Sequence, residues 1–411
     1  MKKLPEVSGN FSIFVPENTG NMQTLITLFR QKLELTPMSF FRSFHQQINW
    51  NCRLIGILGQ KGVGKSTLIL QHIKQYDDIS ETLYVTADDM YFASHSLFEL
   101  AYAFSAKGGK KLYIDEIHKY KGWSQQIKQI YDLLPLLKIV YSGSSILDLE
   151  RGGGDLSRRT VEYHLPVLSF REYLNLRNGW NLQTSSLDEI LKGKVDFPYG
   201  EHRPLKYFEE YKKYGCYPFF QEPEFALRLR QVINTTVELD IPKFAEMNIA
   251  SADKLKKLMY YISQSVPVKI NYSQMERDLG LDRNDLPKYI EYLEKAELLT
   301  ALRLKTNGDS ILRKPDKLYL ENSNMADVLC GSDSNVGNTR ETLFLCWMRR
   351  VYEVYESPVS DFELEGKPFE VGGKSKGKKQ ILTADEGYIV KDDIEYAYEN
   401  QIPLWMFGFI Y

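Results

Sequence analysis

The stretch at residues 53–67, RLIGILGQKGVGKST, limits the possible folds more than any other part of this chain. An apolar run at residues 54–58 leads directly into G-x-x-x-x-G-K-S, the pattern of a phosphate-binding P-loop. The pattern predicts a strand before the loop and a helix after it, at residues 66–76. Glycines let the backbone approach a phosphate closely, and consecutive N–H groups then form an anion site at the helix N-terminus. The predicted phosphate-binding residues are Gly59, Gln60, Lys61, Gly62, Val63, Gly64, Lys65, Ser66 and Thr67.

The side chains of this loop and of a later acidic pair predict ATP with Mg²⁺ as the ligand. Lys65 would contact the β- and γ-phosphates, and the Ser66 hydroxyl would bind Mg²⁺. The segment KLYIDE ends a predicted strand with the acidic pair Asp115 and Glu116. We expect Asp115 to hold the water shell of the metal, and Glu116 to take the proton of the attacking water. The alternative is a surface acidic pair that follows a strand by chance.

Two further segments provide candidates for a catalytic role. The segment Ser142-Gly143-Ser144-Ser145 lies at the end of the predicted strand 138–142, and a hydroxyl there, with Ser144 as the candidate, could contact the γ-phosphate or the attacking water. The alternative is a turn of small residues. Arg158 and Arg159 lie further on, and one of them could neutralise the charge that develops during phosphoryl transfer. The alternative for this pair is a solvated basic surface.

Short apolar runs alternate with helical spans around the P-loop. This alternation predicts βαβ units, and hence an α/β fold with a buried parallel sheet and helices on both faces. The expected strands are 54–58, 82–86, 111–114 and 138–142, and the expected helices are 24–33, 66–76, 96–106 and 123–131.

Composition is that of ordinary globular domains. The chain has 411 residues, enough for two or three domains, with 43% hydrophobic and 26% charged residues. A formal net charge of −2 gives no global basic field that would favour nucleic acid. The four cysteines form no C-x-x-C pair, which favours a reducing compartment over zinc or a disulfide framework. No signal peptide and no membrane span is predicted, so we expect a cytoplasmic protein.

We predict five segments: an N-terminal helical extension (1–50), a P-loop ATPase domain (51–180), a helical connector (181–250), a winged-helix domain (251–330) and a small α/β domain (331–411). The winged helix is predicted from helices at 253–263 and 286–296, from a capping box at 273–276, and from apolar runs on either side of the turn Asn307-Gly308. In the last segment we expect a helix at 341–351, a largely antiparallel sheet, a helix at 393–398 and a final strand at 403–410.

The motifs together resemble a known family. GQKGVGKST, LYIDEIHKYKGWSQQIKQIYD, YSGSSILDLE, DLSRR and LSFREYL resemble AAA+-related ATPases of bacteria and archaea in which a domain of unknown function follows the ATPase. GCYP, KPDKLYLENSN, TRETLF and FEVGGKSKGKKQ resemble the C-terminal part of the same family, so the resemblance covers almost the whole chain. It implies a winged helix and a restriction-endonuclease-like fold at the C-terminus.

The implied C-terminal fold normally carries a metal-binding acidic set and a lysine. The corresponding candidates are Glu341, Asp361, Glu370 and Lys374. The spacing departs from the pattern, because Gly372 stands where the lysine belongs and Lys374 comes two positions late. A two-residue shift keeps the same strand face, but the glycines make the end of the strand irregular.

Three hypotheses for function follow. The first is an ATP-dependent switch with slow hydrolysis, in which ATP changes how the winged-helix and C-terminal domains dock on the ATPase. The second is an ATP-regulated DNA-binding protein or nuclease, and the third is a protein-interaction module with structural ATP. The predicted recognition helix, LPKYIEYLEKA, mixes lysines with glutamates, which favours packing over DNA reading. A DNA or protein partner and an oligomer are both compatible with the sequence.

Overall fold

A five-stranded parallel sheet forms the first part of the fold. The computed structural model describes residues 21–143, 156, 158–245, 247, 249–264, 266–305, 314–330, 336–373 and 387–411. The sheet has the order β2-β3-β4-β1-β5, and its strands are β1 (Leu54–Leu58), β2 (Thr82–Thr86), β3 (Lys111–Asp115), β4 (Lys138–Gly143) and β5 (Val161–His164). Every residue of β1 is buried, as expected for a strand covered on both faces. The predicted P-loop NTPase fold class is confirmed.

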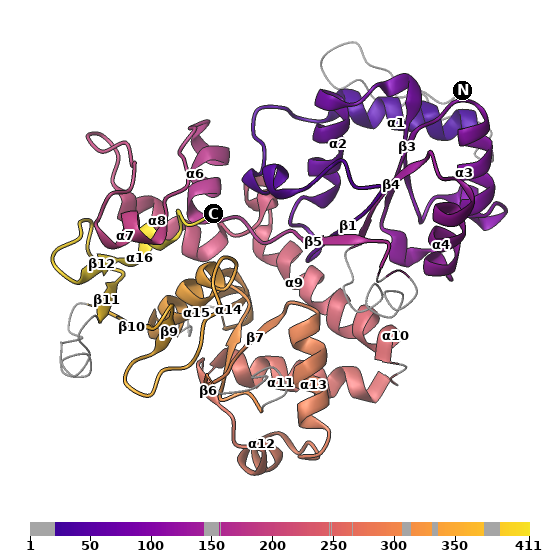
Figure 1. Ribbon diagram of the computed structural model, residues 1–411. Helices are drawn as coiled ribbons and strands as arrows, with labels where there is room; N and C mark the ends of the chain where they lie inside the picture. The colour runs from indigo at the N-terminus through magenta and orange to yellow at the C-terminus, as the bar shows by residue number, and fades with distance from the viewer. Residues whose placement is uncertain are drawn as a thin grey trace.

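Helices cover both faces of this sheet (Figure 1). Helix α2 (Lys65–Tyr76) packs with α1 (Met22–Leu35), whose Phe29 ring lies 6.3 Å from the ring of Tyr84 on the edge strand β2. Helices α3 (Leu97–Ala106) and α4 (Trp123–Leu133) pack together on the other side. Right-handed crossovers produce this division, because the step from β1 to β2 and the later steps run in opposite directions along the sheet.

Strand β5 was not predicted from the sequence. It pairs in parallel with β1, with Ile55 opposite Val161 and Leu58 opposite His164. As an edge strand it is mostly exposed, so its residues, VEYH, carry no apolar run that would mark a buried strand. The chain then continues from β5 across the carboxyl end of β1, where the Leu165 N–H donates to the Leu58 carbonyl at 2.8 Å.

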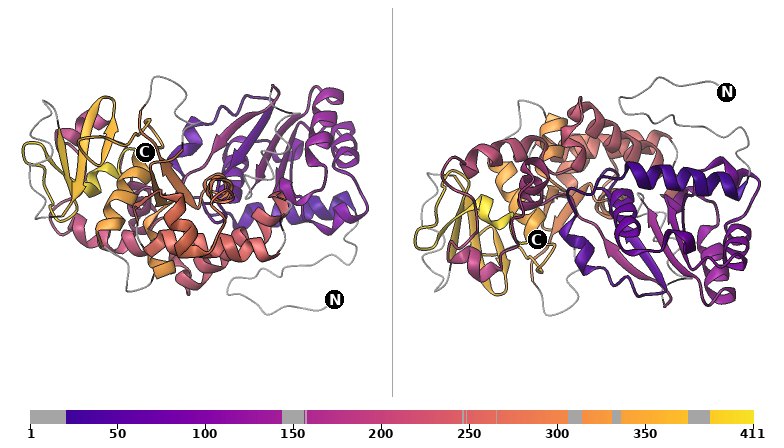
Figure 2. Two further views of the ribbon diagram at one scale, coloured as in Figure 1. Left: turned by 90° about the horizontal axis from the view of Figure 1, so that it is seen from below. Right: turned by 90° about the horizontal axis from the view of Figure 1, so that it is seen from above.

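A helical region follows, and it connects the sheet with the rest of the chain (Figure 2). Its elements are α6 (Phe170–Asn178), α7 (Leu187–Leu191), α8 (Pro204–Tyr214), the 3₁₀ helix η5 (Pro218–Gln221), α9 (Phe225–Thr235), η6 (Thr236–Asp240) and α10 (Ile241–Ala245). The residue that follows α9 keeps helical dihedrals, and η6 is a π-helical turn that leads directly into α10. Short π-helical segments occur frequently at functional sites.

Three helices and a small antiparallel sheet come next. They are α11 (Ile249–Gln264), β6 (Val268–Lys269), α12 (Tyr272–Leu279), α13 (Leu286–Lys295), β7 (Leu299–Leu302) and β8 (Lys317–Leu320), with the sheet order β6-β8-β7. The predicted capping box is wrong, because Ser273 lies inside α12 and the side chain of Asn271 caps the helix instead. The predicted turn Asn307-Gly308 lies outside the described residues.

The last segment contains α14 (Ser323–Cys330), α15 (Val336–Met348), α16 (Leu404–Phe407) and a four-stranded sheet. Its strands, β9 (Phe362–Leu364), β10 (Lys367–Gly372), β11 (Tyr388–Lys391) and β12 (Gln401–Pro403), have the order β12-β11-β10-β9. The expected antiparallel centre is wrong, because β10, β11 and β12 pair in parallel and only β9 is antiparallel.

Two local predictions in this segment are also wrong. Residues 393–398 form bends and an isolated β-bridge rather than a helix, and the predicted strand at 403–410 stops at Pro403. Proline can end a strand, and Leu404–Phe407 then forms a helical turn that is buried on all sides. A continuous apolar run does not distinguish a buried strand from a buried helix, which is why the sequence pattern misled here.

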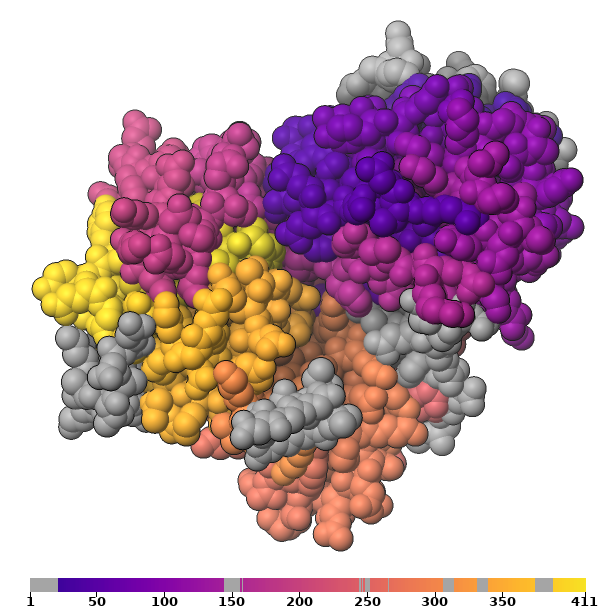
Figure 3. Space-filling model, in the orientation of Figure 1, coloured from indigo at the N-terminus to yellow at the C-terminus, as the bar shows by residue number. Residues whose placement is uncertain are grey.

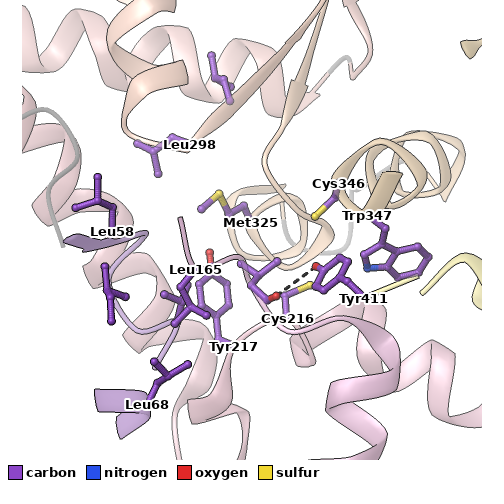
Figure 4. Packing of buried hydrophobic residues seen from close by; sticks show 14 of the residues in the cluster. Leu58, Leu68, Leu165, Cys216, Tyr217, Leu298, Met325, Cys346, Trp347 and Tyr411 are labelled. Atoms are coloured by element: carbon purple, nitrogen blue, oxygen red, sulfur yellow. Dashed lines mark hydrogen bonds between the residues drawn. The ribbon is translucent and has the colours of Figure 1, made fainter. Parts of the chain in front are cut away.

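We use "C-terminal half" for residues 205–411. It packs against the sheet domain through a continuous apolar core, and the space-filling view shows the two parts in contact (Figure 3). Figure 4 shows Leu58 and Leu165 from the sheet domain, with Tyr217 placed between Leu165 and Met325 of α14. Within the part of the chain that the structure describes, no helix has the length and apolar character needed to cross a bilayer.

Candidate nucleotide-binding site

The predicted P-loop joins the end of β1 to the start of α2 and has the backbone that its glycines allow. Gly59, Gly62 and Gly64 have φ values of +146°, +84° and +96°, which L-residues with side chains rarely adopt. A Cβ on Gly59 would lie 2.6 Å from the Leu165 carbonyl oxygen, so a side chain there would displace the chain after β5. The loop is therefore a tight backbone cradle directly before the N-terminus of a 12-residue helix.

Lys65 lies inside this cradle. Its side chain is 5% exposed, and its ammonium donates to the carbonyls of Gly59 and Gln60 at 2.8 and 2.7 Å. Burial lowers the pKa of Lys65 to about 8, an effect opposed by the nearby charges of Glu116 and Asp115. The structure thus brings the predicted phosphate-binding lysine and the predicted acidic pair into one site.

Asp115 ends β3 and is held by two hydroxyl groups. Tyr84 of β2 donates to one carboxylate oxygen at 2.6 Å, and Ser142 of β4 donates to the other. The carboxylate is 4% exposed, and burial, followed by the charge of Asp115, raises the pKa of Tyr84 well above its ordinary value. The ends of three neighbouring parallel strands therefore fix the orientation of Asp115. Tyr84 was not predicted as a site residue, whereas Ser142 opens the segment in which a hydroxyl was expected to contact the γ-phosphate or the attacking water.

Glu116 follows in the left-handed conformation, with a φ of +52°, and its side chain lines the cavity described below. Its Oε2 lies 3.4 Å from Nε2 of His118, a buried side chain. Burial lowers the pKa of His118 to about 3, so the imidazole is neutral at neutral pH. The contact consequently joins a neutral imidazole to a carboxylate and is not an ion pair.

A cavity of about 800 Å³ opens over the P-loop, and segments far apart in the chain line it. The P-loop side contributes Lys61, Gly62, Gly64, Lys65, Ser66 and Thr67. The segment before β1 contributes Pro37, Ser39, Phe40 and Arg42, and the C-terminal half contributes Pro218, Phe219, Arg228, Gln231, Val232 and Thr235. The volume is in the range of small-molecule sites. Helix α9 therefore forms one wall of the predicted nucleotide site.

A buried ion pair between Arg42 and Glu172 supports the backbone of the P-loop. The Arg42 guanidinium donates to Glu172 of α6 at 3.0 Å and to the Val63 carbonyl in the P-loop at 2.8 Å. The side chains of Arg42 and Glu172 are 4% and 1% exposed. Neither residue was predicted as functional, since no local pattern links positions 130 residues apart.

The other predicted catalytic residues have different surroundings. Arg159 forms a two-pronged ion pair with Asp132 of α4, with both distances 3.1 Å. Neither Arg158 nor Arg159 is among the described residues that line the cavity, so their assignment as an arginine finger stays a prediction. Ser144 lies outside the described residues.

The predicted C-terminal carboxylates lie around β9, β10 and α15. Asp361 accepts a hydrogen bond from the Val371 N–H at 2.8 Å, next to the buried Glu370. Glu341 accepts a hydrogen bond from the Tyr319 hydroxyl at 2.9 Å. Burial and the charge of Glu341 raise the pKa of Tyr319, and Asp361 adds to this effect. Among the described residues, no group of three or more His, Cys, Asp and Glu side chains could hold a metal. Lys374 lies outside those residues.

Two parts of the chain match known family models. Residues 51–174 match a family model described as an AAA domain. Residues 205–335 match a second model, described as a domain of unknown function (DUF8612). The P-loop, the acidic pair and the strand β4 all fall inside the first match, so the candidate nucleotide site lies in the part of the chain that is similar to an AAA domain.

Two relatives match most of the chain. Two uncharacterised proteins of Methanocaldococcus jannaschii, MJ1637 and MJ1544, are 25% and 24% identical to this chain over 83% and 86% of its length, and over 81% and 88% of their own. A solved structure, the Walker-type ATPase PABY2304 of Pyrococcus abyssi, is 14% identical and covers 76% of this chain and 98% of its own, with a TM-score of 0.42.

Proposed function

We propose that this protein binds Mg-ATP at the P-loop, hydrolyses it slowly, and acts as a switch in which the nucleotide changes how the C-terminal half packs on the sheet domain. The observation that carries the proposal is the cavity whose walls include both Lys65 and the helix α9. A ligand that contacts two parts of a protein changes their relative packing when its contacts differ between the two arrangements.

The chemistry of the site supports ATP with a hard divalent cation. The loop supplies backbone N–H groups from Gly59 through Thr67, together with the ammonium of Lys65. Ser66 and Asp115 offer oxygen ligands, which Mg²⁺ prefers, and the two hydroxyl groups on Asp115 hold its carboxylate in place. The metal, when bound, would neutralise phosphate charge, and Glu116 would accept the proton of the attacking water.

The decisive experiment compares wild type, Lys65→Ala and Lys74→Ala in ATP binding with and without Mg²⁺. Lys74 lies on the same helix α2 and contacts backbone carbonyls of Glu34 and Thr36, so it controls for the loss of one lysine. We expect ATP to bind wild type and Lys74→Ala, and binding and turnover to be lost in Lys65→Ala. Unchanged affinity and rate in Lys65→Ala would refute the assignment.

The nature of the partner is the remaining part of the proposal. The order helix, strand, helix, helix, strand, strand in residues 249–320, with the sheet order β6-β8-β7, supports a winged helix. In α13, five residues are buried and Lys295 pairs with Glu291, which favours a packing role over a DNA-reading one. Measuring ATPase turnover with and without duplex or single-stranded DNA separates a protein-directed switch from the DNA-directed alternative, because stimulation by DNA would favour the latter.

A further inference from the structure

The segment after α8 lies directly on the P-loop. A Cβ placed on Gly62 would be 2.6 Å from the Phe219 ring, and one placed on Gly64 would be 3.5 Å from Pro218. Lys61 in the same loop forms an ion pair with Asp240 of η6 at 2.6 Å, and both side chains are largely buried. The C-terminal half therefore contacts the phosphate-binding backbone itself, not only the rim of the cavity.

One P-loop side chain, that of Gln60, is held entirely by the C-terminal half. Its Oε1 accepts from the Tyr217 hydroxyl at 2.7 Å, and its Nε2 donates to the Glu297 carbonyl in the turn between α13 and β7. The Tyr217 hydroxyl accepts in turn from Asn322 at 3.0 Å, at the start of α14. Gln60 is 5% exposed, and Tyr217 and Asn322 are fully buried. Buried polar groups of this kind are costly unless each is satisfied, so the three side chains hold one another in a single arrangement.

The contacts continue to the end of α15. The Glu297 carboxylate lies 3.7 Å from Arg350, and Arg350 and Arg349 both pair with the fully buried Glu321. Glu321 precedes Asn322 in the chain, so both branches from Gln60 converge on the same short segment. The carbonyl of Gln60 also accepts the hydrogen bond from Lys65 described above.

We propose that Tyr217 is a positioning residue that sets the P-loop conformation through Gln60 and thereby couples nucleotide binding to the cluster of Glu297, Glu321, Arg349 and Arg350, which we call the acidic–arginine cluster. This inference rests on the proposed function and names the contacts by which the switch operates. A phosphate in the cradle attracts Lys65 away from the Gln60 carbonyl and competes with Asp240 for Lys61. Both changes act on the P-loop, whose Gln60 side chain holds Tyr217. The arrangements with and without nucleotide therefore differ in contacts at the P-loop and at the acidic–arginine cluster. By thermodynamic reciprocity, the packing of the acidic–arginine cluster also changes nucleotide affinity.

The test is Tyr217→Phe, which removes one hydroxyl and keeps the ring in the core. The matched control is Tyr113→Phe, since Tyr113 is also a buried tyrosine, and its hydroxyl donates to Asp77 at 2.7 Å in the sheet domain. We expect Tyr217→Phe to bind ATP about tenfold more weakly, the order expected for one buried hydrogen bond. We further expect ATP to change amide hydrogen exchange of residues 321–330 and 339–350 in wild type and in Tyr113→Phe, and not in Tyr217→Phe.

A double-mutant cycle tests whether Tyr217 acts through Gln60. If it does, Tyr217→Phe has no further effect on ATP affinity in a Gln60→Met background, whereas additive effects overturn the inference. The inference also fails alone if Lys65→Ala abolishes binding while Tyr217→Phe matches Tyr113→Phe in affinity and exchange. Two results overturn the inference together with the proposed function. One is that Lys65→Ala binds ATP as well as wild type does, and the other is that wild type binds no ATP at all.

Discussion

Replacing Arg42 by alanine should strongly lower the free energy of unfolding. Arg42 donates to the Glu172 carboxylate and to the carbonyls of Val63, Pro166 and Val167, at 2.8 to 3.1 Å. Removing it leaves the Glu172 charge buried, with donors remaining from Ser43. Breaking a buried ion pair in this way costs about 3–5 kcal/mol. Because Arg42 lines the cavity and water can reach the freed carbonyls, we expect a loss of about 3 kcal/mol in the free energy of unfolding.

The assay is urea denaturation followed by tryptophan fluorescence, with Arg30→Ala as the control, since Arg30 is exposed on α1. Combining Arg42→Ala with Glu172→Gln should cost less than the sum of the single variants, because the double variant no longer buries an unpaired charge. A strictly additive pair, or a cost for Arg42→Ala no larger than that of Arg30→Ala, would refute the reasoning. ATP affinity should also fall in Arg42→Ala, because the Val63 carbonyl of the P-loop loses its support.

The same pair predicts how stability depends on pH. Burial alone raises the pKa of Glu172, but the charges of Arg42 and Arg171 outweigh it and the net pKa is lowered. A lowered folded-state pKa stabilises the protein above the unfolded value of about 4.3, and this contribution disappears as the pH falls through the folded-state value. In Arg42→Ala the larger of these two lowering charges is gone, so the folded-state pKa of Glu172 rises towards the unfolded value. The acid-induced loss of stability that Glu172 causes should therefore be smaller in Arg42→Ala than in wild type, and urea denaturation at a series of pH values measures it.

Three further outcomes are expected. Glu116→Gln should bind ATP with wild-type affinity and hydrolyse it at least about 100-fold more slowly in single turnover, since an amide cannot accept the proton; a wild-type rate would place the base elsewhere. Gly62→Ala should weaken ATP binding, because position 62 has a positive φ and a Cβ there would contact the Phe219 ring. Adding Phe219→Leu should restore part of the affinity, and a double variant that binds no better than Gly62→Ala would contradict this explanation. Incubation with plasmid and single-stranded DNA and Mg²⁺ or Mn²⁺ should show no cleavage that depends on Asp361 and Glu370; cleavage lost in Asp361→Ala and Glu370→Ala would make the nuclease hypothesis the leading one.

The sheet domain was predictable because its signals are local. The β1 strand, the glycines of the P-loop and the strand that ends in Asp115 are each short patterns with one physical meaning, and the structure places these elements as predicted. Carboxyl ends of parallel strands meet at one edge of a sheet, so the proximity of Lys65 and Asp115 followed from the fold class. Strand β5 escaped prediction because an edge strand needs few apolar residues.

The side chains that distant segments contribute to the site were not predictable, because no local pattern in the sequence shows which segments become neighbours in the fold. Tyr84 and Ser142 reach Asp115 only because β2, β3 and β4 are neighbours, and a tyrosine in a buried strand signals merely that its hydroxyl needs some partner. Tyr217 lies in the GCYP motif, but its partner Gln60 lies 157 positions earlier. In the C-terminal sheet, short apolar runs did not give strand direction, and the antiparallel expectation failed there.

The polar character of the contact at Gln60 needs an explanation, because the surrounding interface is apolar. Leu165 and Met325 lie close to Tyr217 in a core that well-packed hydrophobic residues could complete with equal or greater stability (Figure 4). A hydrophobic side chain at position 60 would hold the C-terminal half equally well for any P-loop conformation, because apolar contacts are not directional. The hydrogen bonds from Tyr217 and to the Glu297 carbonyl are directional, and they are satisfied only when the loop backbone presents Gln60 in one orientation. The polar relay therefore makes the stability of the interface depend on the conformation of the phosphate-binding loop, which an apolar interface could not do.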